Sequence, residues 1–398
     1  MFNHVTLISC SLFCAVFFQT VSGQIVISKD AKHENPQLYV SGFTGSAEVE
    51  KKVRETLLRC GWFDVINQAA PTGYVLDGAE AGGQLSLRVQ KGGAVVATVQ
   101  VRVPGDDVNE LVYTGVDAVI ETLFKTPGPC LSRIAFATEN NGKKEVVTCY
   151  FDGSGMERLT YNQSISTEPA WGRTTDFLVY TLYGSGGGTR VMQVDMKQGR
   201  QRVIAAFPGL NSGAALSPDG AFAALCLSRD QQVDLYVMRI ADGKLRRLTR
   251  DRSVESSPTW SPDGKHLCYV SDRAGGRPQL YVMPAAGGRA ERVFADYAEA
   301  VSPDWSPVSN KICFATRMGG QYVIGVLDMA ADTREKTIIS SGPGDFEAPS
   351  WGGDGRHLVC TRTVPGGRQI MMLDTWTPRS IAVTKPGGNS LPSWAPVR

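Results

Sequence analysis

Short apolar runs separated by turns rich in Gly, Pro and Asp repeat along the last two thirds of the chain. Each repeat is marked by a tryptophan, or once a leucine, that recurs every 43 to 46 residues, at Trp171, Leu216, Trp260, Trp305, Trp351 and Trp394. The clearest copy, from Pro258 to Gly264, reads Pro-Thr-Trp-Ser-Pro-Asp-Gly. Proline favours the second position of a type I turn and glycine closes it, so this stretch predicts a hairpin corner. With the three apolar runs that follow the mark, one repeat predicts four short strands.

Four-stranded units at a period of about 40–50 residues are typical of a β-propeller, in which the blades pack radially. Six marks predict six blades. The segment from Arg133 to Thr160 lacks an innermost strand, whereas the last mark, Trp394, has no further strands after it. We therefore expect residues 391–396 to complete the blade begun at 133–160, which closes the ring and removes an open sheet edge. A solenoid of sheets would explain the period but not this divided blade.

Residues 24–126 do not repeat and predict a small α+β domain. Apolar positions at helical spacing predict one helix that begins after Ser46 and stops at Gly61. They predict a second helix after Asp107, which stands in capping-box spacing with Glu110. Alternating apolar residues on both sides of a Lys-Gly-Gly turn predict a β-hairpin with one buried face. The fold class expected is thus an α+β N-terminal domain, a linker at 127–131, and an all-β six-bladed β-propeller over 132–398 closed by the C-terminal strand.

The first 23 residues resemble a signal peptide cleaved after Gly23, with an apolar stretch from Val5 to Phe18. About 14 apolar residues are too few to span a bilayer. No other segment predicts a transmembrane helix, so the mature chain is expected to be exported and soluble. A net charge of +2 with both signs interspersed predicts no nucleic-acid partner.

Seven cysteines follow the expected signal peptide, and four of them fall in the second strand of four different blades. At such positions cysteine behaves as a small apolar residue, and no Cys-x-x-Cys spacing occurs. No structural disulfide is expected. Whether Cys60 and Cys130, which flank much of the first domain, approach each other is left open by the sequence.

The innermost strand of each blade is expected to begin just before its mark, so the residues there should line the mouth of the central channel. These candidate partner-binding residues are Glu168, Asn211, Ser212, Gly213, Ser256, Ser257, Glu299, Glu347, Asn389 and Ser390. Three carboxylates among small polar residues predict an acidic, hydrogen-bonding rim suited to a polar or basic loop of a partner. Tight loops also require small residues, so a purely structural role is the alternative.

Candidate catalytic groups are few. No Gly-x-Ser-x-Gly nucleophile elbow occurs, and His266 and His357 are expected as surface turn residues on different blades. The residue spacing supports neither a metal site nor a cofactor. The carboxylates of Glu168, Glu299 and Glu347 could serve acid–base chemistry at the channel mouth. A secreted propeller enzyme, either a lyase or a glycosidase, or a sugar binder is therefore the second hypothesis.

The order of these parts resembles the TolB family, periplasmic proteins of the Tol–Pal system, over essentially the whole mature chain. The most specific stretches are 57–63, 131–136, 247–249, 258–264, 269–273, 279–283 and 287–288. The chain departs from that family at Leu216, in the altered corners after Trp171, Trp305 and Trp351, and in the short segment before Ser28.

The resemblance implies a non-enzymatic periplasmic scaffold, expected as a monomer, that serves outer-membrane integrity and envelope constriction at cell division. In the family, one face of the propeller binds the peptidoglycan-associated lipoprotein Pal. The extreme N-terminal segment engages the inner-membrane protein TolA or folds back onto the protein. Here that segment is Gln24, Ile25, Val26 and Ile27. Its strand propensity suits addition to a sheet edge of a partner and equally an ordinary edge strand of its own domain.

Overall fold

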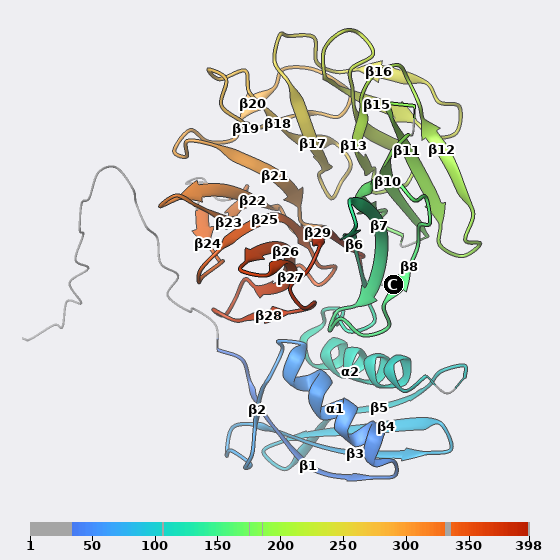
Figure 1. The fold of residues 1–398 in the computed structure, drawn as a ribbon. Coiled ribbons are helices and arrows are strands. Elements are labelled where there is room, and N and C mark those ends of the chain that lie inside the picture. Colours follow the sequence, from blue (N-terminus) through green and yellow to red (C-terminus); the bar gives the residue numbers. More distant parts are fainter. Residues whose placement is uncertain (1–33, 106, 175, 185, 331–335, 397–398) are drawn as a thin grey trace, which may run out of the picture.

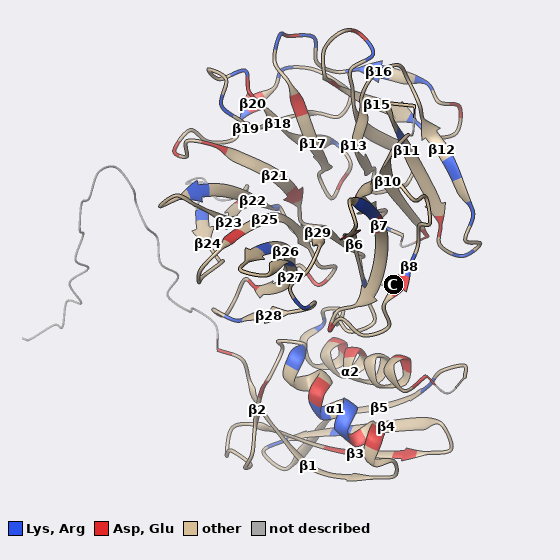
Figure 2. Cartoon of the chain, viewed as in Figure 1, with Lys and Arg blue, Asp and Glu red and all other residues tan. Residues whose placement is uncertain are grey.

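The protein is described by a computed structural model that covers residues 34–396, apart from 106, 175, 185 and 331–335. The expected signal peptide and the segment Gln24–Ile27 lie outside the described residues. The chain forms two parts, a small α+β domain and a larger ring of sheets stacked on it (Figure 1). Basic and acidic residues are interspersed over both parts (Figure 2).

The first part is a five-stranded sheet with two helices against it. The strand order is β2-β1-β3-β4-β5, with β1 parallel to both of its neighbours. The elements are β1 (Gln37–Thr44), α1 (Ala47–Arg59), β2 (Asp64–Ile66), β3 (Tyr74–Ala81), β4 (Gln84–Lys91), β5 (Ala94–Arg102) and α2 (Val108–Phe124). The β4–β5 pair is the expected hairpin. Its buried face, with the apolar stripes of both helices, forms one core.

Both helix starts are fixed by side-chain caps, as the sequence predicts. The Ser46 hydroxyl accepts a hydrogen bond from the backbone N–H of Val49, and the Asp107 carboxylate accepts from the N–H groups of Asn109 and Glu110. These contacts satisfy donors that the first helical turn leaves without a partner. The α1 helix ends where Gly61 takes a φ of 78°, a conformation that glycine adopts without steric cost.

The second part is the predicted six-bladed propeller, in which every blade is a four-stranded antiparallel sheet. We number the blades from the one that contains β6. Blade 1 holds β29 (Asn389–Trp394), β6 (Arg133–Asn140), β7 (Lys143–Tyr150) and β8 (Glu157–Arg158). Blade 2 holds β9 (Ser166–Trp171), β10 (Phe177–Tyr183), β11 (Thr189–Asp195) and β12 (Gln201–Ala205). Blade 3 holds β13 (Asn211–Leu216), β14 (Phe222–Leu227), β15 (Asp234–Arg239) and β16 (Leu245–Arg247).

The other three blades follow the same order from the channel outward. Blade 4 holds β17 (Glu255–Trp260), β18 (His266–Ser271), β19 (Gln279–Pro284) and β20 (Glu291–Arg292). Blade 5 holds β21 (Ala300–Trp305), β22 (Lys311–Met318), β23 (Gln321–Asp328) and β24 (Lys336–Ile338). Blade 6 holds β25 (Asp345–Trp351), β26 (His357–Val364), β27 (Gly367–Asp374) and β28 (Ser380–Ala382).

The ring closes as the divided repeat predicts. Strand β29 pairs with β6, with Asn389 opposite Thr138 and Trp394 opposite Ile134. The Trp394 indole N–H also donates to the Ser132 hydroxyl at 2.6 Å. The end of the chain therefore supplies the innermost strand of the blade that the first domain leads into.

The first domain packs on the end of the propeller where the innermost strands finish. Arg356, in the turn after β25, is 1% exposed and donates to the Gly61 carbonyl at 2.8 Å and to the Asn35 side chain at 2.7 Å. On blade 1, Asp152 in the turn after β7 forms an ion pair with Lys52 at 3.0 Å. The channel end where innermost strands begin is consequently left uncovered by the first domain.

His357 differs from its expected position at the surface. It is 1% exposed, and its Nδ1 lies 2.6 Å from Oδ2 of the buried Asp354. The repeat pattern predicts the position of His357 within its blade, but it does not predict that the first domain covers this turn. His266, at the corresponding turn of blade 4, has no such cover and is exposed as expected.

Candidate functional site: the propeller channel

The wall of the channel is built from one backbone irregularity repeated in all six blades. Three residues before each mark, the backbone is left-handed, with φ between 49° and 59°, at Glu168, Gly213, Ser257, Ser302, Ala348 and Leu391. In blade 4, Ser256 pairs with Val270 and Thr259 with Cys268, so two residues of β17 stand opposite one of β18. This is a β-bulge, which turns the extra residue out of the ladder.

The bulge explains the recurring proline. Pro258 and its counterparts in four other blades occupy the second bulge position, where no ladder hydrogen bond is made. Proline has no N–H to donate and is tolerated in a strand mainly at such places. Blade 3 alone has an alanine, Ala214, in place of this proline, and it follows Gly213 at the first bulge position.

All six left-handed residues line one cavity of about 360 Å³ in the channel. The cavity reaches five of the predicted residues, namely Glu168, Ser212, Gly213, Ser256 and Ser257. Within the part of the chain that the structure describes, the other five predicted residues are not among its lining, namely Asn211, Glu299, Glu347, Asn389 and Ser390. Asn211 is fully buried and its amide donates to backbone carbonyls, including that of Phe207 at 2.7 Å. Ser390 is 3% exposed, one residue before the left-handed position.

The three predicted carboxylates do not form one acidic group. Glu168 faces the cavity, but its Oε2 accepts from the Thr181 hydroxyl at 2.8 Å and from the Gly213 N–H at 3.1 Å. Glu299 pairs with Arg317 at 3.5 Å. Burial raises the pKa of Glu347, reinforced by Asp345 and opposed by neighbouring arginines. The rim is therefore mixed in charge, and the cavity does not bring two of these carboxylates together.

Two charged residues missed by the sequence reasoning face each other across the channel. Arg173 follows β9 of blade 2, and Asp304 lies in β21 of blade 5, the opposite blade of a six-membered ring; both line the cavity. Burial raises the pKa of Asp304, while the Trp351 N–H, the Arg173 charge and the Thr259 hydroxyl lower it. Arg173 and Asp304 thus add one basic and one acidic side chain to the lining of the cavity.

Asp304 also belongs to a set of contacts that join neighbouring blades. The side chain one residue before a mark accepts a hydrogen bond from the backbone N–H of the next blade's mark. The acceptors are Thr259 for Trp305 at 3.1 Å, Asp304 for Trp351 at 2.8 Å, Ser350 for Trp394 at 3.1 Å and Ser393 for Trp171 at 3.1 Å. Ala170 and Ala215 hold this position in blades 2 and 3 and offer no side-chain acceptor. We call these contacts the inter-blade clasps.

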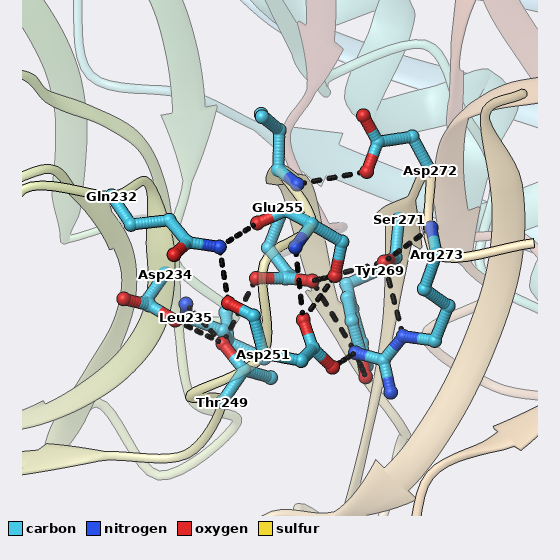
Figure 3. Close-up of polar contacts among 12 residues, drawn as sticks. Gln232, Asp234, Leu235, Thr249, Asp251, Glu255, Tyr269, Ser271, Asp272 and Arg273 are labelled. Carbon is cyan, nitrogen blue, oxygen red and sulfur yellow. Dashed lines mark hydrogen bonds and ion pairs between the residues drawn. The ribbon is translucent and has the colours of Figure 1, made fainter. Parts of the chain in front are cut away.

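A buried polar network positions the mouth at blade 4 (Figure 3). Glu255, the first residue of β17, is 0% exposed and accepts from the hydroxyls of Ser253 at 2.8 Å, Ser271 at 2.9 Å and Thr249 at 3.1 Å. Arg273 approaches the same carboxylate at 3.3 Å. Burial raises the pKa of Glu255 and the hydroxyls lower it. The network fixes the start of β17, so that Ser256 and Ser257 are held at the cavity.

Among the described residues there is no cluster of three His, Cys, Asp or Glu side chains arranged to hold a metal ion. The cavity is mixed polar and apolar, and its lining combines five of the marker tryptophans with serine, alanine, leucine and proline. Such a surface can accept a loop or a small ligand through shape and hydrogen bonds.

The fold and the site define a closed six-bladed propeller that carries an α+β domain on the end opposite its open channel mouth. The chain belongs to the TolB propeller family, because the family model described as the TolB beta propeller domain matches residues 120–398. Within residues 34–396, as far as they are described, no helix is long and apolar enough to cross a membrane.

Two curated relatives show the extent of the sequence likeness. The Tol-Pal system protein TolB of Anaeromyxobacter dehalogenans is 32% identical over 253 residues, which cover 54% of this chain and 55% of that protein. A protein TolB homolog of Chlorobium luteolum is 34% identical over 149 residues, which cover 36% of this chain and 32% of that protein. The chain thus spans between about a third and just over half the length of these relatives.

Two solved structures share the fold. The crystal structure of TolB from Acinetobacter baumannii has a TM-score of 0.82 at 21% identity and covers 92% of this chain and 98% of that one. A putative TolB from Agrobacterium tumefaciens has a TM-score of 0.54 at 17% identity, with 65% and 91% covered. The first of these likenesses extends over both parts of the molecule.

Proposed function

We propose that this protein is a periplasmic scaffold of a Tol–Pal system that binds the peptidoglycan-associated lipoprotein Pal at the mouth of its propeller channel. The observation that carries the proposal is the cavity in the propeller channel, whose lining includes Ser212 and Ser256 at the end that the first domain leaves free, in a chain of the TolB family. The predicted signal peptide and the relatives named as Tol-Pal proteins support the compartment and the system.

The cavity has room for part of a partner loop. A cavity of about 360 Å³ is sufficient for a few side chains, while the rim around it supplies hydrogen-bonding and charged groups such as Arg317 and Glu299. A protein interface of ordinary size buries about 800 Å² on each partner, so contacts on the rim must add to those in the cavity.

A second contact is proposed for the N-terminal segment Gln24–Ile27, which links the scaffold to TolA or an equivalent inner-membrane protein. The described chain begins beside the first domain (Figure 1). That domain contacts the turns after β25 and β7, at the end of the propeller away from the starts of the innermost strands. Two partners at opposite ends would not compete for space. This arrangement suits the proposed role in outer-membrane integrity and in envelope constriction at division.

The test is a pull-down from detergent-solubilised envelope, with the wild type and a Gly213→Trp variant as baits. Gly213 has a φ of 59°, and an added Cβ there would meet no atom closer than 3.4 Å. An indole at this position should therefore enter the cavity with little disturbance of the fold. The matched control is Gly220→Trp, because Gly220 is also left-handed, at 69°, and lies in an open turn at the other end of the blade.

The expected result is that the wild type and Gly220→Trp retain a small peptidoglycan-binding lipoprotein and Gly213→Trp does not. Thermal unfolding of all three proteins checks that the difference is not one of folding. If the wild type retains no envelope protein, the scaffold proposal is abandoned. The lyase, glycosidase or sugar-binding alternative would then be tested by screening small glycans for a rise in melting temperature.

A further inference from the structure

Two cysteines that are far apart in the sequence meet at the base of the first domain. Cys60 is the C-terminal cap of α1, and Cys130 lies in the segment between α2 and β6. Both side chains are 0% exposed and belong to the same hydrophobic core. Burial raises the pKa of the Cys130 thiol most, and a side-chain contact with the Cys60 thiol raises it further, so the two thiols are neighbours in this core.

Ordered contacts hold the backbone on each side of this pair. The Cys60 N–H donates to the Thr56 carbonyl at 2.8 Å, which continues the last turn of α1. The Cys130 N–H donates to the buried Asp117 carboxylate at 2.9 Å, and the next N–H, of Leu131, donates to the same carboxylate at 2.9 Å. The proximity of the thiols is therefore set by two anchored segments, not by a free loop.

The other five cysteines of the described chain lie in propeller strands. Cys226, Cys268, Cys313 and Cys360 lie in the second strands of blades 3 to 6, one to a blade, and Cys149 lies in β7. Like Cys60 and Cys130, all five are buried free thiols in this structure. They fill apolar space between sheets, as small hydrophobic residues do.

We propose that Cys60 and Cys130 form a disulfide when the chain folds in an oxidising compartment, joining the end of α1 to the segment that leads into the propeller. The inference requires the export expected from the N-terminal sequence but not the binding of any partner. Disulfides persist in exported proteins because no reducing pool acts on them there.

The oxidant is a disulfide-bearing compound or protein, and the reaction is thiol–disulfide exchange. One cysteine thiolate attacks the oxidant to give a mixed disulfide, and the second thiolate displaces the oxidant's remaining thiol. Two protein thiols lose two electrons and two protons, and the oxidant is released as two thiols. Burial raises the pKa of the Cys130 thiol well above its usual value, so the folded core contains little thiolate. The bond therefore forms during folding, before the core closes.

The covalent link would act on the boundary between the domains. The loop from Cys60 to Cys130 encloses β2 to β5 and α2. Gly61 and Trp62, which contact Arg356 of blade 6, directly follow the first cysteine. Fixing Cys60 to the interdomain segment would hold these contacts in place even when the sheet of the first domain opens.

Peptide mapping of the wild-type protein tests the inference. The chain is exported to a bacterial periplasm with its own leader, purified without reductant, denatured in N-ethylmaleimide and digested with trypsin. The expected result is a peptide 60–88 linked to 126–133, seen before but not after reduction, and two fewer alkylated cysteines than in the reduced protein. A Cys226→Ala variant should give the same linked peptide.

A second measurement uses stability. Protein refolded with oxidised and reduced glutathione should unfold at a temperature several degrees higher than protein refolded with dithiothreitol. A Cys60→Ser, Cys130→Ser double variant should show no such difference. If peptides 60–88 and 126–133 are recovered only as separate alkylated species, even after refolding with oxidised glutathione, the proposed disulfide does not exist.

Discussion

The Arg356 guanidinium donates hydrogen bonds to both carboxylate oxygens of Asp374, at 2.9 and 2.7 Å, inside the boundary between the two domains. Its flat faces lie 4.8 and 4.5 Å from the ring centroids of Trp62 and Trp376. Although burial opposes ionisation, the Arg356 contacts and the His357 charge lower the pKa of Asp374 to about 2. One side chain of blade 6 thus links the propeller to the first domain through charge, stacking and hydrogen bonds.

Replacing this arginine should weaken the whole boundary. In Arg356→Met the Asp374 carboxylate stays buried without its partner, a situation that costs about 3–5 kcal/mol. Denaturant unfolding should show the loss, together with a separate early transition for the first domain. The control is Arg362→Met, since Arg362 is a half-buried arginine whose guanidinium donates to the Pro343 carbonyl and lies over the Phe346 ring, without a buried carboxylate as its hydrogen-bond partner in the described chain. An equal loss in both variants would contradict the special role of Arg356.

The buried Asp117 should make stability depend on pH. Burial raises its pKa to about 6, against the lowering effect of the Leu131 and Cys130 N–H groups. Because the folded-state pKa lies above the ordinary value of 3.8, the contribution is fully present below that value and is lost as pH rises through about 6. The free energy of unfolding should therefore fall between pH 4 and pH 7.

Asp117→Asn should reduce this pH dependence. It should also cost stability at every pH, because an amide cannot accept from both backbone N–H groups as the carboxylate does. Denaturant titrations at pH 5 and pH 7 measure both effects. Glu121→Gln, on the exposed side of the same helix, is the control and should keep the wild-type pH dependence. An unchanged pH dependence in Asp117→Asn would show that other groups cause it.

The contribution of a single inter-blade clasp to stability should be measurable both by removing one clasp and by adding one. Ser350→Ala removes the acceptor for the Trp394 N–H and should destabilise the propeller by about 1 kcal/mol. Ala170→Ser adds a hydroxyl where the same contact is missing, towards the N–H of Leu216, and should raise stability by a similar or smaller amount. Thermal unfolding of the two variants gives the comparison. Loss of stability in both would mean that packing, not the clasp, decides the effect.

The left-handed residues of the channel wall should carry backbone strain. A left-handed conformation costs a non-glycine residue about 1–2 kcal/mol, and Ala348 holds it with a φ of 49°. Ala348→Gly should therefore be neutral or stabilising by up to about 1 kcal/mol. Ala215→Gly, at a position without a positive φ, should instead destabilise by about 0.5–1 kcal/mol. Denaturant midpoints compare the two, and equal losses would refute the strain.

The blade count, the closing strand and both helix starts follow from the sequence because each depends on local chemistry. The Ser46 and Asp107 caps act within one helical turn, and the spacing of the tryptophans reports the length of one blade. The position of His357 could not be found in this way, since the domain that buries it lies almost 300 residues earlier in the chain. Its equivalent in blade 4, His266, carries the same local signal and is exposed.

The channel residues were predicted only in part because each innermost strand was expected to begin just before its mark, whereas it begins five or six residues before it and contains a bulge. The bulge moves the inward-facing position to the residue before the recurring proline. That signal was present in the sequence and identifies Ser302, Ala348 and Leu391, which were missed. Glu299, six residues before Trp305, lies outside the cavity for the same reason. Arg173 and Asp304 line the same cavity only because opposite blades face each other, which no single repeat reveals.

Because of the six bulges, the side chains that face the channel are largely different from the groups that join the strands and blades. Apart from Glu168, whose carboxylate bonds to the next blade, the left-handed side chains are outside the strand ladder and the clasps. A combinatorial library at Gly213, Ser257, Ser302, Ala348 and Leu391 could therefore redesign the chemistry of the cavity on an unchanged frame.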